Sequence, residues 1–258
     1  MSTLRAVRFF ACSGAVLLGA LVCQPASAAA ALDPGAPPGS NFDLSAWELQ
    51  EPVGEPGKPT TISASRLGDG FQDKYFYTDS TDGSMTFWDP ENGVTTPNSH
   101  YPRAELREMT STGEAASWPV SGTHRLTASV DVSEVPDHVC VGQIHLAEGS
   151  GSTKPLVELY YYANGDIKMG VEDSPDGGQT QHPMGNVPLG QKWSYEISLT
   201  GGDTIGLVLD GKQTTWPLDS SFKDYPMYFK AGNYNQSTSS SSTVGARVHF
   251  FALGVSHG

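Results

Sequence analysis

Three short segments of the chain combine residue types that bind carboxylates and move protons. They read RAELRE (103–108), QIH (143–145) and YFKAGNYNQ (228–236). In a β-strand, alternate side chains share one face. One face of each segment would then be apolar and pack into a core. The other face would present guanidinium, carboxylate, carboxamide, imidazole, ammonium and phenol groups, which suit an anionic ligand and proton transfer.

The same alternation assigns each residue of the three segments to a face. The residues expected on the polar faces are Arg103, Glu105, Arg107, Gln143, His145, Tyr228, Lys230, Tyr234 and Gln236. Asn233 falls on the opposite face and is not a candidate. Each segment alone could equally be a half-solvated strand, because a surface ladder of ion pairs contributes little stability and a single histidine is more often structural. Only the three segments together indicate a site.

In this order, RAELR, QIH and YFKAGNYNQ resemble the three signature segments of the alginate lyases of polysaccharide lyase family 7. The stretch PLGQKWSYEISLTGGDTIGLVLDG resembles the paired strands that this family carries between its second and third signatures, and the likeness spans most of residues 40–256. The resemblance implies a β-jelly roll whose concave sheet carries a cleft. It also implies a lyase that cleaves the 4-O-glycosidic bond of alginate, an anionic polysaccharide, and releases 4,5-unsaturated uronate oligosaccharides.

Cleavage of alginate by β-elimination needs three chemical functions. The C5 proton lies next to a carboxylate and is barely acidic, so the carboxylate must be neutralised while a base removes the proton. An acid must then protonate the departing O4. A guanidinium, with its permanent charge and fixed fork of donors, suits the first function. We expect Arg103 to serve it with help from the Gln143 amide.

The resemblance places the base and the acid on His145 and Tyr234. An imidazole with an ordinary pKa of ~6.5 is largely neutral slightly above neutral pH, as a base must be. Cationic neighbours would lower the pKa of Tyr234, and it could then act as base and acid on mannuronate, where C5–H and O4 lie on the same side. On guluronate these groups lie on opposite faces, which favours His145 as base and Tyr234 as acid.

The other polar residues of the three segments are expected to serve the substrate more indirectly. Glu105 lies between two arginines and is expected to orient them. The residues expected in substrate binding are Glu105, Arg107, Tyr228, Lys230 and Gln236, although Lys230 could also be an ordinary surface lysine. Ile144 replaces a valine in the middle of QIH, a variant that in the family leans towards guluronate-containing substrate. Several subsites along an open cleft would favour endolytic cleavage.

Short strand-like runs separated by turn signals occupy the rest of the chain. An Asn-Gly pair at 164–165 and turns at Gly201–Gly202 and Asp210–Gly211 mark the expected hairpins. Helical turns are expected only near 44–47 and 220–223. This pattern predicts an all-β protein, with one catalytic β-jelly roll of two packed antiparallel sheets over residues 41–258.

The N-terminal residues carry the pattern of a secretory signal peptide. Arg5 and Arg8 precede the apolar run FFACSGAVLLGALVC and the small residues of PASAAA, which predicts a signal peptide over residues 1–28 and a secreted protein. The apolar run is too short for a membrane anchor. Residues 29–40 are rich in proline and glycine and predict an extended leader.

Charge and cysteine content limit the partners. The formal net charge of −13 becomes −15 without Arg5 and Arg8, which argues against a nucleic-acid partner. An anionic substrate must therefore be held by local basic residues, which screening over ~8–10 Å permits. Two of the three cysteines lie in the predicted signal peptide, so the mature chain keeps only Cys140, expected as a small core residue. We expect a monomer without a membrane partner.

Two alternative functions fit a similar fold. A non-catalytic carbohydrate-binding jelly roll would not need an imidazole and a phenol beside a carboxylate clamp. A retaining glycoside hydrolase needs two carboxylates ~5–5.5 Å apart; no Glu-x-Asp-x-x-Glu spacing occurs, and flanking arginines would lower the pKa of Glu105 and spoil it as an acid. No metal or cofactor is expected, because arginines supply the electrophile and no metal-ligand spacing is present.

Overall fold

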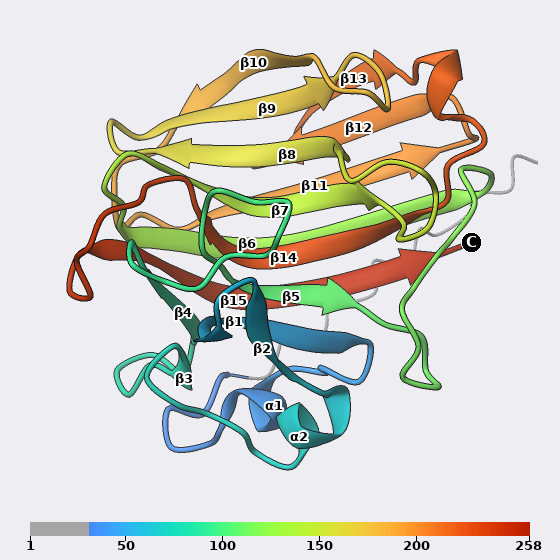
Figure 1. The fold of residues 1–258 in the computed structure, drawn as a ribbon. Helices are drawn as coiled ribbons and strands as arrows, with labels where there is room; N and C mark the ends of the chain where they lie inside the picture. Colours follow the sequence, from blue (N-terminus) through green and yellow to red (C-terminus); the bar gives the residue numbers. More distant parts are fainter. Residues whose placement is uncertain (1–30) are drawn as a thin grey trace, which may run out of the picture. The chain divides into compact units, whose positions relative to one another are not determined.

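Two antiparallel β-sheets pack face to face in the computed structural model, which describes residues 31–258 (Figure 1). The predicted signal peptide and the first residues of the predicted leader lie outside the described residues. The two sheets contain eight and seven strands, and we refer to them as sheet A and sheet B. The prediction of an all-β jelly roll is confirmed.

Sheet A carries the three polar segments. Its strands, in spatial order, are β10 (Gln179–Asn186), β9 (Asp166–Glu172), β8 (Pro155–Tyr162), β7 (His138–Leu146), β14 (Met227–Asn235), β5 (Ala104–Glu108), β1 (Trp47–Glu55) and β2 (Lys58–Ile62). Residues 104–108 of RAELRE form β5, QIH lies in β7, and YFKAGNYNQ forms most of β14. The register sets Lys230 opposite Arg107 on one side and opposite Gln143 on the other. Segments far apart in the sequence thus become adjacent strands.

Sheet B covers the inner face of sheet A. Its strands, in spatial order, are β13 (Lys212–Pro217), β12 (Thr204–Leu209), β11 (Trp193–Thr200), β6 (Thr123–Glu134), β15 (Gly245–His257), β4 (Met85–Pro90) and β3 (Phe76–Thr78). The core between the sheets contains fully buried apolar side chains from both, including Leu106, Ile144 and Phe229 from sheet A and Phe87 and Phe250 from sheet B. The inward faces predicted for the three polar segments therefore lie in this core.

The hairpins mostly form where the turn signals predict them. The Asn164–Gly165 pair joins β8 to β9, and Gly201–Gly202 lies between β11 and β12. The β12–β13 hairpin turns at Asp210 and Gly211, whose φ angles of 46° and 81° are left-handed. A two-residue turn of this hand needs residues that tolerate positive φ, which explains the Asp-Gly pair.

The leader differs from the prediction because it is not extended throughout. It turns at residues 34–35, and the short helix α1 (Pro38–Asn41) begins with a proline whose fixed φ suits the first helical position. A second short helix, α2 (Ala64–Gly68), was not predicted. Its Leu67 carbonyl lies so close to Gly39 that any Cβ there would overlap it. Among the described residues, no helix is long and apolar enough to cross a membrane.

The two predicted helical turns differ in form. Residues 220–223 contain the 3₁₀ helix η1 (Ser220–Phe222), as predicted. Near 44–47 the chain makes only a turn, closed by the bond from the Trp47 N–H to the Leu44 carbonyl at 3.1 Å. Trp47 then begins β1, where its buried side chain packs in the core.

A bulge in β14 sets the position of the last polar residues. Ala231 and Tyr234 pair with Gly142 and Cys140 on β7, so β14 holds one extra residue at this point. Gly232 has a φ of 145°, and a Cβ there would lie 2.9 Å from a main-chain atom of β5. Only glycine permits this close approach of β5 and β14.

Candidate active site

A cleft lies on the face of sheet A that turns away from sheet B. It has a volume of about 480 Å³. Eight of the nine predicted site residues line it, namely Arg103, Arg107, Gln143, His145, Tyr228, Lys230, Tyr234 and Gln236. The four side chains predicted to carry the chemistry therefore converge on one space, as alternation along three adjacent strands requires.

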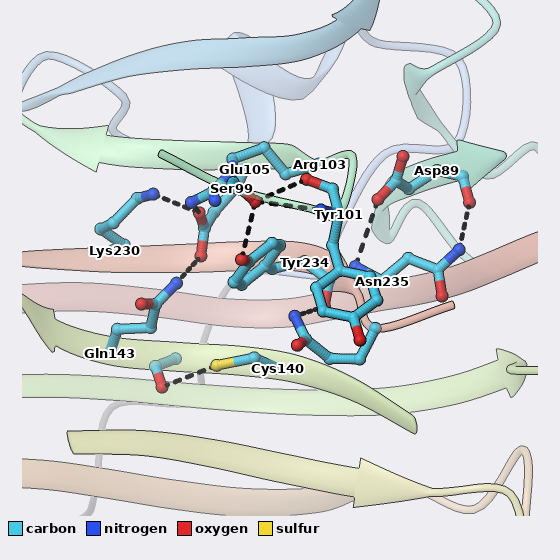
Figure 2. A network of polar contacts seen from close by, with 12 residues as sticks. Asp89, Ser99, Tyr101, Arg103, Glu105, Cys140, Gln143, Lys230, Tyr234 and Asn235 are labelled. Carbon is cyan, nitrogen blue, oxygen red and sulfur yellow. Dashed lines mark hydrogen bonds and ion pairs between the residues drawn. The ribbon is translucent and has the colours of Figure 1, made fainter. Parts of the chain in front are cut away.

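Glu105 is the ninth predicted residue, and it lies beneath the cleft floor. Its Oε2 accepts hydrogen bonds from Arg103 Nη1 at 3.1 Å and Lys230 Nζ at 2.6 Å, and its Oε1 accepts one from Gln143 Nε2 at 2.5 Å (Figure 2). Burial alone would raise its pKa, but Lys230 and Arg103 hold the pKa below the ordinary value. Glu105 is thus an ionised hub that fixes three side chains of the cleft.

The position of Glu105 corrects two predictions. The residue is 0% exposed and does not line the cleft, so it cannot contact a sugar directly. It orients Arg103 but not Arg107, whose guanidinium instead contacts the Glu108 carbonyl at 3.3 Å and Glu148 Oε1 at 3.5 Å. The two arginines differ because only Arg103 bends towards the hub, while Arg107 lies over the Tyr228 ring at 4.2 Å.

Lys230 and Arg103 provide positive charge at the cleft floor. Burial, followed by the neighbouring Arg103, lowers the pKa of Lys230 to about 8, so the ammonium still carries its charge near neutral pH. The Arg103 guanidinium stacks on the Tyr234 ring, with Cζ 3.8 Å from the ring centroid. Such a desolvated cation–π contact fixes both groups and aligns the guanidinium beside the phenol.

His145 is a neutral imidazole with a defined tautomer. Its Nδ1 lies 2.9 Å from the Leu146 carbonyl, which can only accept, so Nδ1 carries the hydrogen and Nε2 is left as an acceptor. Burial, followed by the positive charge of Lys230, lowers the pKa of His145 to about 3. The imidazole therefore stays neutral, with Nε2 unprotonated, over a wider pH range than the ordinary value predicts.

Tyr234 is a protonated phenol next to Ser99. The Ser99 hydroxyl donates to the Tyr101 carbonyl at 2.9 Å, so at the 2.9 Å contact between the two hydroxyls Tyr234 must be the donor. Burial raises the pKa of Tyr234, although Arg103 and Ser99 oppose the rise. The prediction of a lowered pKa is therefore wrong, because burial raises the pKa of the phenol by more than the positive charge of Arg103 lowers it.

The remaining predicted residues frame the two sides of the cleft. The Tyr228 ring contacts the His145 ring, with centroids 5.2 Å apart, and burial raises its pKa to about 12. Gln236 donates from Nε2 to the Tyr234 carbonyl at 3.1 Å. Both side chains line the cleft without taking part in the Glu105 hub.

Two asparagines of YFKAGNYNQ hold Tyr234 from behind. Asn233 donates to the Phe87 carbonyl at 3.1 Å and to the Ala246 carbonyl at 2.7 Å, both on sheet B. Asn235 donates from its amide side chain to the Asp89 carbonyl and from its main chain to the Asp89 carboxyl, each at 3.2 Å (Figure 2). Asn233 lies on the face that alternation predicts, and the two asparagines tie β14 to sheet B on both sides of the tyrosine.

Several cleft residues were not predicted from the sequence. They are Glu48 and Gln50 on β1, residues 96 and 98–101 in the loop before β5, residues 146, 148–149 and 152–155 from the end of β7 to the start of β8, and Glu158 and Glu172 on β8 and β9. The loop residues follow no strand period, so alternation could not find them. The signal for Glu158 was present, because a lone carboxylate in the apolar strand LVELYYY must face a polar space.

Cys140 is fully buried, donates weakly to the Gly142 carbonyl at 3.5 Å and has a pKa raised by burial, so it is an unreactive thiol. Within residues 31–258, no group of three or more His, Cys, Asp or Glu side chains is placed to hold a metal ion.

Comparison with known proteins gives consistent matches. The family model described as alginate lyase matches residues 42–257. An alginate lyase from Klebsiella pneumoniae is 29% identical over 284 residues, covering 86% of this chain and 91% of the relative. The structure of family 7 alginate lyase A1-II′ in complex with product (GGG) has 37% identity and a TM-score of 0.79, covering 87% of this chain and all of that one. The alginate lyase of Pseudomonas aeruginosa has 36% identity and a TM-score of 0.78, covering 84% of this chain and all of that one.

The jelly roll and its cleft, with fixed cations beside a neutral imidazole and a protonated phenol, define a polysaccharide lyase that acts on acidic sugars. The family match extends over most of the chain, and the solved relatives share both its fold and about a third of its residues. The chain belongs to the alginate lyases of polysaccharide lyase family 7. Because it belongs to this family of enzymes, a purely carbohydrate-binding role and a glycoside hydrolase are both set aside.

Proposed function

We propose that the chain is a secreted endolytic alginate lyase in which Arg103, His145 and Tyr234 are the catalytic residues and Gln143 assists Arg103. The observation that carries this proposal is the protonation of the site: a neutral imidazole with a free Nε2 and a protonated phenol line the same cleft. These are the states that a general base and a general acid need before the reaction begins.

Each step of the elimination then has a group to perform it. Arg103 and the Gln143 amide bind the carboxylate of the sugar and stabilise the negative charge that spreads onto it. His145 Nε2 removes the C5 proton, the C4–C5 double bond forms, and the C4–O4 bond breaks. The Tyr234 O–H turns from Ser99 to O4 and protonates it. The phenolate that remains is stabilised by Arg103, and by Ser99 once its hydroxyl turns from the Tyr101 carbonyl to the phenolate oxygen.

We further propose a preference for guluronate-containing substrate. On guluronate the proton and O4 lie on opposite faces, which suits a separate base and acid. On mannuronate Tyr234 would first have to lose its own proton, and its raised pKa opposes this. The Ile144 variant of QIH supports the same preference. Ile144 is fully buried in the core, so its effect reaches the sugar only through the placement of its neighbours Gln143 and His145.

Endolytic action is supported by the extent of the cleft. Its lining residues come from β1, β5, β14, β7, β8 and β9, six neighbouring strands of sheet A. At ~4.8 Å between strands the lining extends roughly 24 Å, which is long enough for several sugars. The A1-II′ relative has been seen with product (GGG) and with substrate (GGMG), and we propose that this cleft binds alginate oligosaccharides in the same manner. Secretion is supported by the signal-peptide pattern.

The test is time-resolved product analysis on block polymers of each uronate, with the ultraviolet absorbance of the new C4–C5 double bond as the readout. We expect Tyr234→Phe to abolish turnover on both polymers and His145→Ala to reduce guluronate cleavage more than mannuronate cleavage. Tyr162→Phe and His138→Ala are matched controls on the same sheet outside the cleft lining. Robust activity in Tyr234→Phe would remove this tyrosine from the mechanism, and early release of only the shortest products would contradict endolytic action.

A further inference from the structure

Two buried carboxyl groups line the β8–β9 side of the cleft, outside the machinery described above. Glu158 lies on β8 and Glu172 at the end of β9, and each is only 8% exposed. Negative charge in the cleft repels a polyanion and weakens its binding. It can be useful there only if it favours one orientation of the bound polymer.

Glu158 is held firmly by two donors. Its Oε2 accepts from the Tyr160 hydroxyl at 2.5 Å and from Gln179 Nε2 at 2.8 Å. Gln179 reaches it from β10 by crossing β9 above Gly170, where any Cβ would overlap the Gln179 side chain. Oε1 of Glu158 makes no hydrogen bond within the described part of the chain. Glu158 thus presents one fixed, free acceptor to the cleft.

Glu172 is buried without a donor. It accepts no hydrogen bond from any described residue, and its Oε2 is fully buried and unpaired. A carboxyl group in this state is costly unless it is neutral or receives a donor from a ligand. The charged groups facing it are Glu158 on β8, Lys154 in the segment before β8, and Asp173 next to it. Burial, followed by Glu158, raises the pKa of Glu172 to about 6.

The sheet register places this acidic pair next to the reacting sugar. Glu158 pairs with Gln143 across β7 and β8, and Gln143 lies beside Arg103 through the shared Glu105 hub. If a sugar is bound at Arg103 and Gln143, a neighbouring sugar of the same chain lies over β8 and β9. Two carboxyl groups then face that sugar, and Lys154 is the one cation among the charged groups that face Glu172.

We propose that Glu158 and Glu172 form a subsite for a sugar adjacent to the one that is cleaved, which binds the hydroxyl groups of that sugar and rejects its carboxylate. This inference rests on the proposed function. Hydroxyl groups supply the donors that the Oε1 atoms of Glu172 and Glu158 lack, whereas a uronate carboxylate supplies none and is repelled. The subsite therefore accepts only a sugar whose carboxylate points away from the cleft floor. The repulsion grows as pH rises and Glu172 loses its proton.

The test compares wild type, Glu172→Gln and Glu172→Leu on one purified alginate oligosaccharide, at about pH 5 and about pH 8 and at fixed ionic strength. We expect Glu172→Gln to lower KM roughly fivefold at the higher pH, to change KM little at the lower pH, and to leave kcat unchanged. The difference at higher pH should shrink when salt screens the charge. Glu172→Leu, which removes the acceptor, should raise KM relative to Glu172→Gln at both pH values.

Each outcome decides one part of the inference. Equal KM for wild type and Glu172→Gln at the higher pH would overturn the rejection of carboxylate. Equal KM for the leucine and glutamine variants would overturn the binding of hydroxyl groups. Glu196→Gln, on the outer surface of sheet B, is the matched control and should follow wild type. If wild type forms no unsaturated product at all, the proposed function fails instead, and the two failures are therefore distinguishable.

Discussion

Glu105 and Glu172 are two buried carboxyl groups on the same sheet with opposite electrostatic behaviour. Burial tends to raise the pKa of both. Glu105 receives donors from Lys230, Arg103 and Gln143, and its pKa is below the ordinary value. Glu172 receives none from the described residues, and its pKa rises to about 6. The two groups differ because the cations Lys230 and Arg103 offset the burial of Glu105, whereas the neighbouring Glu158 adds to the effect of burial on Glu172.

The largest expected effect follows from removing Glu105. Glu105→Ala leaves Arg103 and Lys230 as buried cations without their partner, so we expect the free energy of unfolding to fall by about 3–5 kcal/mol. Urea denaturation at neutral pH measures this fall. Activity should fall by about two orders of magnitude or more, because Arg103 loses the contact that aims it. A loss of stability below ~1 kcal/mol would show that the hub is not what holds these cations.

The second effect concerns Asn233, whose buried amide nitrogen makes two hydrogen bonds across the sandwich but carries no charge. Asn233→Ala leaves the Phe87 and Ala246 carbonyls without a donor, and we expect the free energy of unfolding to fall by about 2–3 kcal/mol. Since Tyr234 is the next residue, kcat should fall more than KM rises. Asn233→Asp, which removes the donor but keeps the shape, should be no better than alanine. A variant with normal kcat would show that Tyr234 is positioned without this tie.

The third effect is a pH dependence of the free energy of unfolding, to which Glu105 and Glu172 contribute with opposite sign. The folded pKa of Glu172 lies above its ordinary value of 4.5, so the folded protein binds more protons and stability decreases as pH rises from about 4.5 to about 6. The decrease is at most ~2 kcal/mol, and Glu172→Gln should abolish it. Glu105 has a lowered pKa, so its contribution is present above about pH 4.5 and is lost as pH falls through its folded pKa.

Chemical denaturation across this pH range separates the two contributions. The free energy of unfolding of wild type minus that of Glu172→Gln should change with pH only between the ordinary pKa of Glu172 and its pKa in the folded protein. A difference that does not vary with pH would mean that Glu172 is solvated in the folded protein and carries an ordinary carboxylate.

The smallest effect is expected at the exposed pair of Arg125 and Glu196. Their side chains are 45% and 30% exposed, and Arg125 Nε lies 3.3 Å from Glu196 Oε1. We expect Glu196→Gln to change the free energy of unfolding by less than ~1 kcal/mol and to leave kcat unaltered. A larger loss would mean that exposed charge pairs on this protein are also strong. The different behaviour of Glu105 and Glu172 could then not be assigned to the buried partners of Glu105.

The sequence predicts the fold and most of the cleft for one physical reason. Alternation along a strand is a local property, so the faces of RAELRE, QIH and YFKAGNYNQ could be assigned without knowing which strands are neighbours. Depth and partners are not local. Glu105 has the same alternation as Arg103 and Arg107, yet only the adjacent Lys230 and Gln143 show that it lies below the floor. The raised pKa of Tyr234 likewise depends on burial by other elements, and Ser99 lies in a loop without a period.

The strand order has a consequence for how the molecule assembles. In sheet A, β14 lies between β7 and β5, and in sheet B, β15 lies between β6 and β4. In each sheet, one of the last two strands of the described sequence thus joins the early strands to the later ones. Strands β1–β5 cannot join β6–β13 through main-chain pairing until these two are in place. Such pairings are distant in sequence, so we expect slow folding with a late, concerted closure, and the catalytic groups come together only in that final event.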